Sequence, residues 1–212
     1  MSRNIYLFSK TENSEVNHVP VLLTEFLKPE INYDNYDAIV LTSKQAVIAL
    51  ENINHEWIKL PVLTIANFTA NQAREAGATV LEHGTGYGDS LAEIIINGYP
   101  DKRWLYPRPV VVASDFAQKV QGAGVSMDGA VVYKTTCNSE VASLKLEDDA
   151  ILIFTSPLTI ECFLKQHEFK ITQKVIAIGK TTATALPKEI DSLMPKETSV
   201  QGCVDLAKSL QL

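Results

Sequence analysis

The chain has 212 residues, enough for one large domain or two small ones, and a chain of this size needs no disulfide or metal ion to stabilise its core. Its apolar content of 46% is ordinary for a soluble globular protein, and a net charge of −6 without a Lys/Arg cluster argues against a nucleic acid as partner. No apolar run reaches the ~20 residues of a membrane-spanning helix, and the segment MSRNIYLFSKTENS does not have the pattern of a signal peptide. We therefore predict a cytoplasmic protein that does not enter a membrane.

Short apolar runs alternate with segments of helical pattern. In chain order, strands are expected over residues 4–9, 38–42, 60–66, 103–114, 150–155 and 174–179, with extended segments over 18–27 and 129–136. Helices are expected after Ser43, from Thr69 to Gly77, over 88–98, after Ser156, after Thr181–Thr182 and over 201–210. This alternation predicts doubly wound, flavodoxin- or Rossmann-like α/β domains with parallel sheets.

One segment of the chain recurs after 113 residues. Residues 36–73, aligned without a gap to 149–186, give seven identities, where unrelated sequences would give about two or three. The identities include two Thr-Ser corners and two helical threonines: Thr42–Ser43 with Thr155–Ser156, and Thr69 with Thr182. Two copies are too few for a solenoid, so the repeat predicts a pair of related domains.

The segments outside the repeat determine the expected topology. Residues 1–34 and 138–212 would form a discontinuous lobe 1, and residues 37–134 an inserted lobe 2. The chain would cross near 34–37 and again near 134–138. Two such crossings predict a two-stranded linker and an interlobe cleft.

Several familiar sequence motifs are incomplete in this chain. The segment IGKTTATAL resembles the end of a Walker A loop, but the first glycine of that motif would fall on Lys174. The segment GTGYGD (84–89) has Asp89 where a dinucleotide fingerprint needs its third glycine. The four histidines have no metal-ligand spacing, and there is no G-x-S-x-G motif. Nucleotide, metal and acyl-transfer sites are therefore not indicated.

The three cysteines are widely spaced and form no CxxC motif. An odd number of such residues does not indicate a disulfide framework. We expect Cys137, Cys162 and Cys203 to be reduced and to pack as small hydrophobic residues.

Hydroxyl residues accompany four of the expected strand–helix corners: Thr42–Ser43, Thr69, Thr155–Ser156 and Thr181–Thr182. In open α/β sheets, ligands bind beyond the carboxyl ends of the strands, where helix N-termini offer N–H groups and partial positive charge to anions. The four corners are therefore candidates for binding a ligand with several carboxylates or phosphates. Alternatively, these Ser and Thr side chains only cap their helices.

The pattern resembles the uroporphyrinogen-III synthase family. The segments that carry the resemblance are AIVLTSKQAV, VVYKTT, ILIFTSPLTIECFL and IAIGKTTATAL. The last is the most specific, because the family has an Ile-Gly-x-Thr-Thr-Ala corner there. The resemblance covers residues 36–212 and, more faintly, the first 35, and it implies two α/β lobes joined by a two-stranded linker.

The resemblance implies a cofactor-independent hydro-lyase of tetrapyrrole biosynthesis. Its substrate, hydroxymethylbilane, would lose its terminal hydroxyl to give an azafulvene, and the last ring would be inverted through a spiro intermediate before closure to uroporphyrinogen III. Eight carboxylates on this substrate agree with the anion-binding corners. Tyr133 of VVYKTT would be the catalytic proton donor; alternatively it packs on a lobe as a linker-strand aromatic.

The substrate contacts follow from the resemblance and from the corners. The resemblance implies contacts at Thr69, Ser156, Thr181 and Thr182, the corners add Thr42, Ser43 and Thr155, and Ser90 is a candidate contact at the rim. The chain departs from the family after its first strand, where Phe8-Ser9-Lys10 replaces Thr-Arg and the following helix is shortened or absent. Lys10 would offer a point charge instead of a bidentate fork, and Arg108 is a candidate carboxylate ligand. We expect a monomer.

Two other classes of protein remain open. A non-catalytic bilobed binding protein or sensor for a polycarboxylate small molecule would bind its ligand without turnover and without a role for Tyr133. A flavodoxin-like regulatory module would need an acidic pair near the first strand, which YLFSK lacks.

Overall fold

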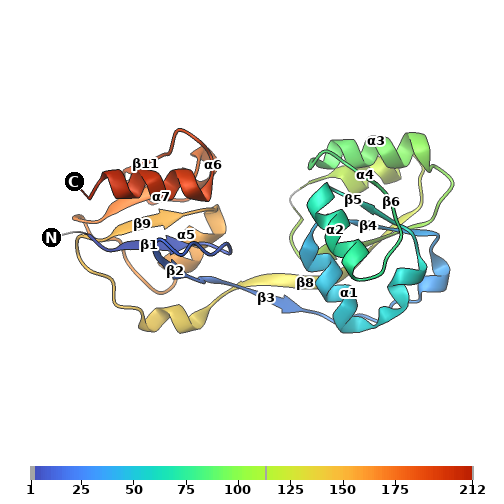
Figure 1. The fold of residues 1–212 in the computed structure, drawn as a ribbon, viewed down its shortest axis with the longest axis horizontal. Helices are drawn as coiled ribbons and strands as arrows, with labels where there is room; N and C mark the ends of the chain where they lie inside the picture. The colour runs from blue at the N-terminus through green and yellow to red at the C-terminus, as the bar shows by residue number, and fades with distance from the viewer. Residues whose placement is uncertain (1–2, 113, 212) are drawn as a thin grey trace. The chain divides into compact units, whose positions relative to one another are not determined.

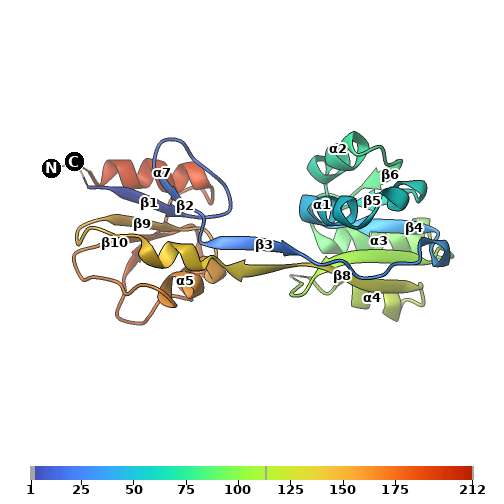
Figure 2. The same cartoon turned by 90° about the horizontal axis from the view of Figure 1, so that it is seen from below.

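The computed structural model describes residues 3–112 and 114–211, which fold into two compact α/β units (Figure 1). Unit 1 comprises the chain up to Leu23 and from Thr136 onward, and unit 2 comprises Thr24–Thr135. The two boundaries fall within β3 (Leu22–Phe26) and β8 (Met127–Cys137), which are neighbours in one sheet and run side by side in opposite directions (Figure 2). The predicted fold class, two parallel-sheet lobes joined by two strands, is confirmed.

Unit 1 is built on a parallel sheet with the strand order β11-β10-β9-β1-β2. Its strands are β1 (Ile5–Phe8), β2 (Asn17–Val19), β9 (Ile151–Phe154), β10 (Lys174–Ala177) and β11 (Ser192–Leu193). Its helices are α5 (Pro157–Leu164), α6 (Lys180–Ala183) and α7 (Val200–Ser209), and a 3-10 turn covers Ser139–Ser143. Between β1 and β2 the chain forms turns and no helix, as expected.

Unit 2 is built on a sheet with the strand order β3-β8-β7-β4-β5-β6, in which β4 to β8 pair in parallel. Its further strands are β4 (Ala38–Leu41), β5 (Val62–Thr64), β6 (Val80–His83) and β7 (Trp104–Pro109). Its helices are α1 (Lys44–Ile53), α2 (Asn67–Glu75), α3 (Gly88–Gly98) and α4 (Phe116–Gly122), with 3-10 turns at Tyr33–Asn35 and His55–Lys59.

Both sheets are covered on both faces, which explains the continuously apolar strands. In unit 2, Ile39 and Leu41 pack with α1 and α2, whereas Val40 and Trp104 pack with α3 and α4. In unit 1, alternate residues of β1 and β9 pack either with α5 or with α7. A strand buried on both faces has no polar alternation, so each sheet forms the middle layer of a three-layer unit.

The 113-residue repeat is confirmed by where the elements begin. β4 and β9 start at Ala38 and Ile151, and the helices that follow them start at Lys44 and Pro157. Since the same offset also relates the starts of α2 and α6, the two units place equivalent residues at equivalent corners. Helix α2 ends at Glu75 and is followed by the cap residue Ala76 and by Gly77, whose φ of 94° is the left-handed conformation expected of a C′ glycine.

The predicted extended segments differ from the structure in detail. Residues 18–27 are interrupted around Pro20, so they belong to two strands in different sheets. Helix α4 was not predicted, because only Phe116, Val120 and a partly buried Ala117 mark its apolar face. Residue 113, inside the predicted strand 103–114, lies outside the described residues.

The expectation of three reduced cysteines is wrong. Cys137 and Cys162 form a disulfide, and Cys203 is a buried free thiol. The bond joins the last residue of β8 to α5, inside the apolar cluster that covers one face of the unit 1 sheet. Twenty-five residues separate the two cysteines in sequence, so only the fold brings them together.

Candidate active site

The carboxyl edge of the unit 2 sheet, where the parallel strands end, carries two hydroxyl pairs. Thr42 and Ser43 follow β4, while Tyr106 lies on β7 and Tyr133 on β8. Because β4, β7 and β8 are successive neighbours, these residues meet across the sheet. Ser43 Oγ and Tyr133 Oη are 2.9 Å apart, and Thr42 Oγ1 and Tyr106 Oη are 3.5 Å apart.

Tyr133, the residue predicted to be catalytic, is enclosed by the protein. Its side chain is 7% exposed. Burial raises the pKa of its phenol above the usual 10, and the hydrogen bond with Ser43 lowers that pKa in part. The phenol is therefore neutral at pH 7 and keeps its proton.

Ser43 has two partners at once. Its Oγ accepts a hydrogen bond from the Ala46 backbone N–H at 3.4 Å and so caps helix α1. The hydroxyl proton of Ser43 can then be donated to Tyr133 Oη, which leaves the phenol proton for another acceptor. The geometry thus permits a polarised phenol that donates outward.

Tyr106 belongs to this candidate site through its contact with Thr42, and sequence analysis missed it. It is buried, and burial raises the pKa of its phenol; the Thr42 hydrogen bond and the positive charge of Arg108 lower it, and Tyr133 raises it. It lies in an apolar run two residues from Trp104, so its pattern predicts only a core position. Its contact with Thr42 depends on the strand order, which the sequence does not specify.

Arg108 lies farther along β7 and is half-buried. Its Nη1 donates hydrogen bonds to the carbonyl oxygens of Pro109 and Val110 at 3.0 and 3.3 Å. The side chain crosses Gly129, where an added Cβ would lie 2.9 Å from Nε. The structure therefore gives Arg108 a fixed path over β8 and leaves its predicted role as a carboxylate ligand untested.

Thr69 does not cap a helix, contrary to the capping alternative. Helix α2 begins at Asn67 after Ala66, and its first turn has no side-chain cap. Thr69 is its third residue, is 4% exposed, and makes no hydrogen bond through its hydroxyl to any described residue. Uncapped N–H groups and an unpartnered hydroxyl lie together at this corner.

Ser90 closes the turn that precedes α3. Its hydroxyl accepts from Thr85 N at 3.0 Å and donates to the Tyr87 carbonyl at 2.9 Å. Gly84 approaches so closely that an added Cβ would lie 2.7 Å from Ser90 Oγ. These contacts give Ser90 a structural role, and its contact with substrate stays a prediction.

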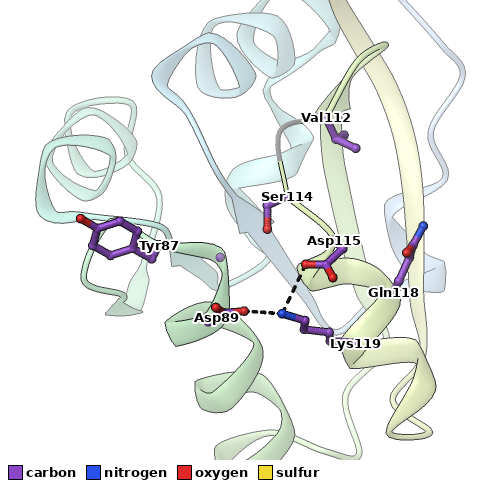
Figure 3. Close-up of a pocket in the computed structure, with 8 residues that line it drawn as sticks. Tyr87, Asp89, Val112, Ser114, Asp115, Gln118 and Lys119 are labelled. Carbon is purple, nitrogen blue, oxygen red and sulfur yellow. Dashed lines mark hydrogen bonds and ion pairs between the residues drawn. The ribbon is translucent and has the colours of Figure 1, made fainter. Parts of the chain in front are cut away.

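A pocket of about 640 Å³ lies between the starts of α3 and α4 (Figure 3). Lys119 Nζ is 2.6 Å from an Asp89 carboxylate oxygen and 3.4 Å from one of Asp115. Tyr87 and Val112 also line it. Because two carboxylates surround its one ammonium, this pocket is poorly suited to an anionic ligand.

The carboxyl edge of unit 1 repeats the first corner of unit 2 without a tyrosine partner. Ser156 Oγ accepts from Thr159 N at 3.3 Å and forms a full capping box with Thr159, at the start of α5. Thr155 Oγ1 donates to the Phe8 carbonyl at 3.3 Å and so ties β9 to β1. Both hydroxyls have protein partners, and both lie at the predicted edge.

The second corner of unit 1 repeats that of α2. Helix α6 begins after Gly179 and has no side-chain cap, so Thr181 and Thr182 lie inside its first turn and do not cap it. Thr182 is 3% exposed, and its hydroxyl makes no hydrogen bond to the described residues, whereas Thr181 is exposed. Thr182 and Thr69 therefore have the same environment in the two units.

Lys10 lies in the turn after β1, next to the buried Ser9. Desolvation lowers the pKa of its ammonium. Ser9 itself is held by its hydroxyl, which donates to the Thr11 carbonyl, and by its carbonyl oxygen, 2.9 Å from His18 Nε2. Lys10 thus starts from an ordered turn at the carboxyl end of β1.

The described residues, 3–112 and 114–211, have neither a metal-binding cluster nor a membrane-spanning helix. They contain no group of three or more His, Cys, Asp or Glu side chains arranged to hold a metal ion. They also contain no helix whose length and apolarity would let it cross a bilayer.

The chain is thus a two-lobed α/β protein, in which paired strands join two parallel-sheet units. Each unit has hydroxyl residues at the carboxyl edge of its sheet, the edge where open α/β sheets generally bind ligands. The family model described as uroporphyrinogen-III synthase HemD matches residues 10–205, and the chain belongs to this family. The predicted resemblance is therefore confirmed.

Solved structures agree with this assignment. The uroporphyrinogen-III synthetase of Helicobacter pylori 26695 is 26% identical with a TM-score of 0.82, over 98% of this chain and 99% of that one. A mutant uroporphyrinogen III synthase of the extremely thermophilic bacterium Thermus thermophilus is 13% identical with a TM-score of 0.56, over 99% and 98% of the two chains, and shows likeness of fold. A comparison with curated proteins found no match.

Proposed function

We propose that this chain is a uroporphyrinogen-III synthase, a hydro-lyase that converts hydroxymethylbilane into uroporphyrinogen III and water. Membership of the family and the likeness to the Helicobacter pylori protein support this proposal. The observation that carries it is the 2.9 Å pair of Tyr133 and Ser43, a buried neutral phenol at the carboxyl edge of a sheet.

Tyr133 would act as the proton donor of the first step. As the bond between carbon and the terminal hydroxyl breaks, its electron pair leaves with oxygen, which accepts the phenol proton and departs as water. Loss of the pyrrole N–H proton from the same ring gives the neutral azafulvene and can restore the phenol. Ser43 donates to Tyr133 Oη during this step and stabilises the developing phenolate.

The ring inversion depends more on how the two ends of the substrate are positioned than on strong acid–base catalysis. A flexible bilane closes directly unless its ends are held in another arrangement, and holding reactive ends in place is a large source of catalysis. The hydroxyls of Thr69 and Thr182 have no hydrogen-bond partner among the described residues, and each lies in the first turn of a helix without a side-chain cap. This arrangement suits carboxylates. We assign substrate carboxylates to these corners and to Thr42, Ser156 and Thr181. The hydroxyl protons of Ser43 and Thr155 are donated instead to Tyr133 Oη and to the Phe8 carbonyl.

The test is product analysis with freshly prepared hydroxymethylbilane. The protein should give uroporphyrinogen III well above the isomer I that forms spontaneously, and Tyr133→Phe should lower kcat about a hundredfold. Tyr36→Phe is a matched control, because Tyr36 lies near the amino ends of β4 and β7, away from the proposed contacts. Tight binding without turnover would instead favour the non-catalytic binding protein.

A further inference from the structure

Lys44 and Phe68 form a cation–π pair beside the proposed contacts of unit 2. The Lys44 ammonium lies 5.4 Å from the centre of the Phe68 ring. Lys44 is the first residue of α1, directly after Ser43, and Phe68 is in the first turn of α2, directly before Thr69. Each member of the pair is therefore adjacent in sequence to a hydroxyl residue at the carboxyl edge of the unit 2 sheet.

Phe68 is unusually exposed for a side chain of its size. Its exposed fraction is 68%, and with Lys44 over one face the ring is held at the surface with the rest open. Other exposed apolar side chains follow β6 and β7 of the same sheet: Tyr87, Val110, Val111 and Val112. A single exposed apolar residue is ordinary, but several around one sheet edge mark a binding surface.

The internal repeat supports a specific role for the pair. At the equivalent positions, 113 residues on, unit 1 has Pro157 and Thr181. Proline is favoured at the first position of a helix, and threonine is tolerated in its first turn. The fold of this corner therefore needs neither a lysine nor a phenylalanine, and the pair in unit 2 has no evident structural purpose.

We propose that Lys44 and Phe68 form a subsite for one carboxylate-bearing pyrrole ring of the substrate. The pyrrole stacks on the open part of the Phe68 ring, and one of its carboxylates pairs with the Lys44 ammonium. Charge and shape both select this occupant, since an anion-bearing aromatic ring is complementary to a cation beside an aromatic ring. This subsite rests on the proposed function, and it predicts binding specificity and not chemistry.

The repeat also provides the test substitution, Phe68→Thr, which installs the residue of unit 1. We expect KM for hydroxymethylbilane to rise about tenfold and kcat to stay within twofold of the wild type. The reason is that the stacking contact would bind the substrate and the transition state equally well. Phe68→Tyr retains the ring and should keep KM within twofold of the wild type. Ile171→Thr is the matched control, because Ile171 is fully exposed in the loop before β10, at the amino end of its strand.

Lys44→Gln tests the charged half of the subsite. KM should rise about fivefold, and the salt dependence of KM should become weaker, because one ion pair with the substrate is lost. Lys59→Gln, at the end of the 3-10 turn His55–Lys59, is the control for a general loss of surface charge. A Phe68→Thr protein that is folded by circular dichroism and has a wild-type KM would overturn the proposal.

A binding measurement tests the subsite independently of the proposed enzymatic activity. Equilibrium dialysis with uroporphyrinogen III under nitrogen measures the subsite whether or not the protein turns substrate over. Binding that weakens about tenfold in Phe68→Thr, with no turnover by the wild type, would refute the synthase and keep the subsite. Equal binding by both proteins would refute the subsite alone, and no binding by the wild type would refute both.

Discussion

Replacing Ser43 by glycine would test whether its hydroxyl acts through Tyr133. Glycine is almost as good as serine at an N-cap, so helix α1 should lose only a few tenths of a kcal/mol. Tyr133 Oη, in contrast, loses its 2.9 Å partner. A hydrogen bond between neutral groups contributes about 1 kcal/mol, which corresponds to a decrease in kcat of about fivefold.

The double variant Ser43→Gly/Tyr133→Phe decides the interpretation. If Ser43 acts only by orienting the phenol, its loss should have no further effect once the phenol is gone. Steady-state kinetics with hydroxymethylbilane, with the isomers separated after oxidation, measure all four proteins of this cycle. Ser43→Thr should restore most of the activity, since it retains a hydroxyl.

The cap of another helix provides the matched control. Ser199 caps α7, where its Oγ accepts from Gly202 N at 2.9 Å, and it is not among the proposed contacts. Ser199→Gly should leave kcat unchanged. A further fivefold loss in the double variant, relative to Tyr133→Phe alone, would refute the role of Ser43 as a positioning residue.

Three further predictions concern stability. The buried hydroxyl of Tyr33 has no hydrogen-bond partner among the described residues, so Tyr33→Phe should raise the free energy of unfolding by about 1 kcal/mol. Tyr6→Phe should lower that free energy, because it removes a 2.9 Å hydrogen bond to the Glu147 carboxylate. Urea unfolding that ranks the two variants in the opposite order would contradict this. Burial raises the pKa of both phenols to about 12, so on raising the pH they ionise in the unfolded chain before they ionise in the folded protein. The free energy of unfolding should therefore be level below about pH 10 and fall between pH 10 and 12. The double variant Tyr6→Phe/Tyr33→Phe should show a smaller fall. Reducing the Cys137–Cys162 disulfide, whose cysteines are 25 residues apart in sequence, should lower the free energy of unfolding by about 3.5 kcal/mol. Thiol titration of the oxidised protein in denaturant should detect Cys203 alone. Three thiols before reduction would refute the disulfide.

The fold could be predicted because the same strand–helix pattern occurs twice in the sequence. Apolar runs at 38–42 and 150–155, each followed by a serine cap, carry the strand–helix signal in both copies, and the structure begins its elements at the same offset. Patterns of this kind are local, since burial on both faces and helix capping are decided within a few residues. Helix α4 was missed because it has only seven residues, too few to show a clear helical repeat of apolar residues.

The contacts of the site could not be predicted, because they depend on the order of strands in the sheet. Ser43 and Tyr133 are ninety residues apart in sequence and meet only because β7 brings β4 and β8 to the same edge. The disulfide has the same origin, since spacing alone does not pair cysteines. Thr69 was expected at the start of its helix, but α2 begins at Asn67, after an Ala66 that offers no side-chain cap.

The central claim is that this chain directs hydroxymethylbilane to the inverted isomer. The most direct measurement supplies fresh hydroxymethylbilane to the purified protein and resolves uroporphyrins I and III after oxidation. We predict isomer III in clear excess over the spontaneous isomer I, with the rate of its formation reduced about a hundredfold by Tyr133→Phe. Isomer I alone, from a folded protein, would contradict the synthase.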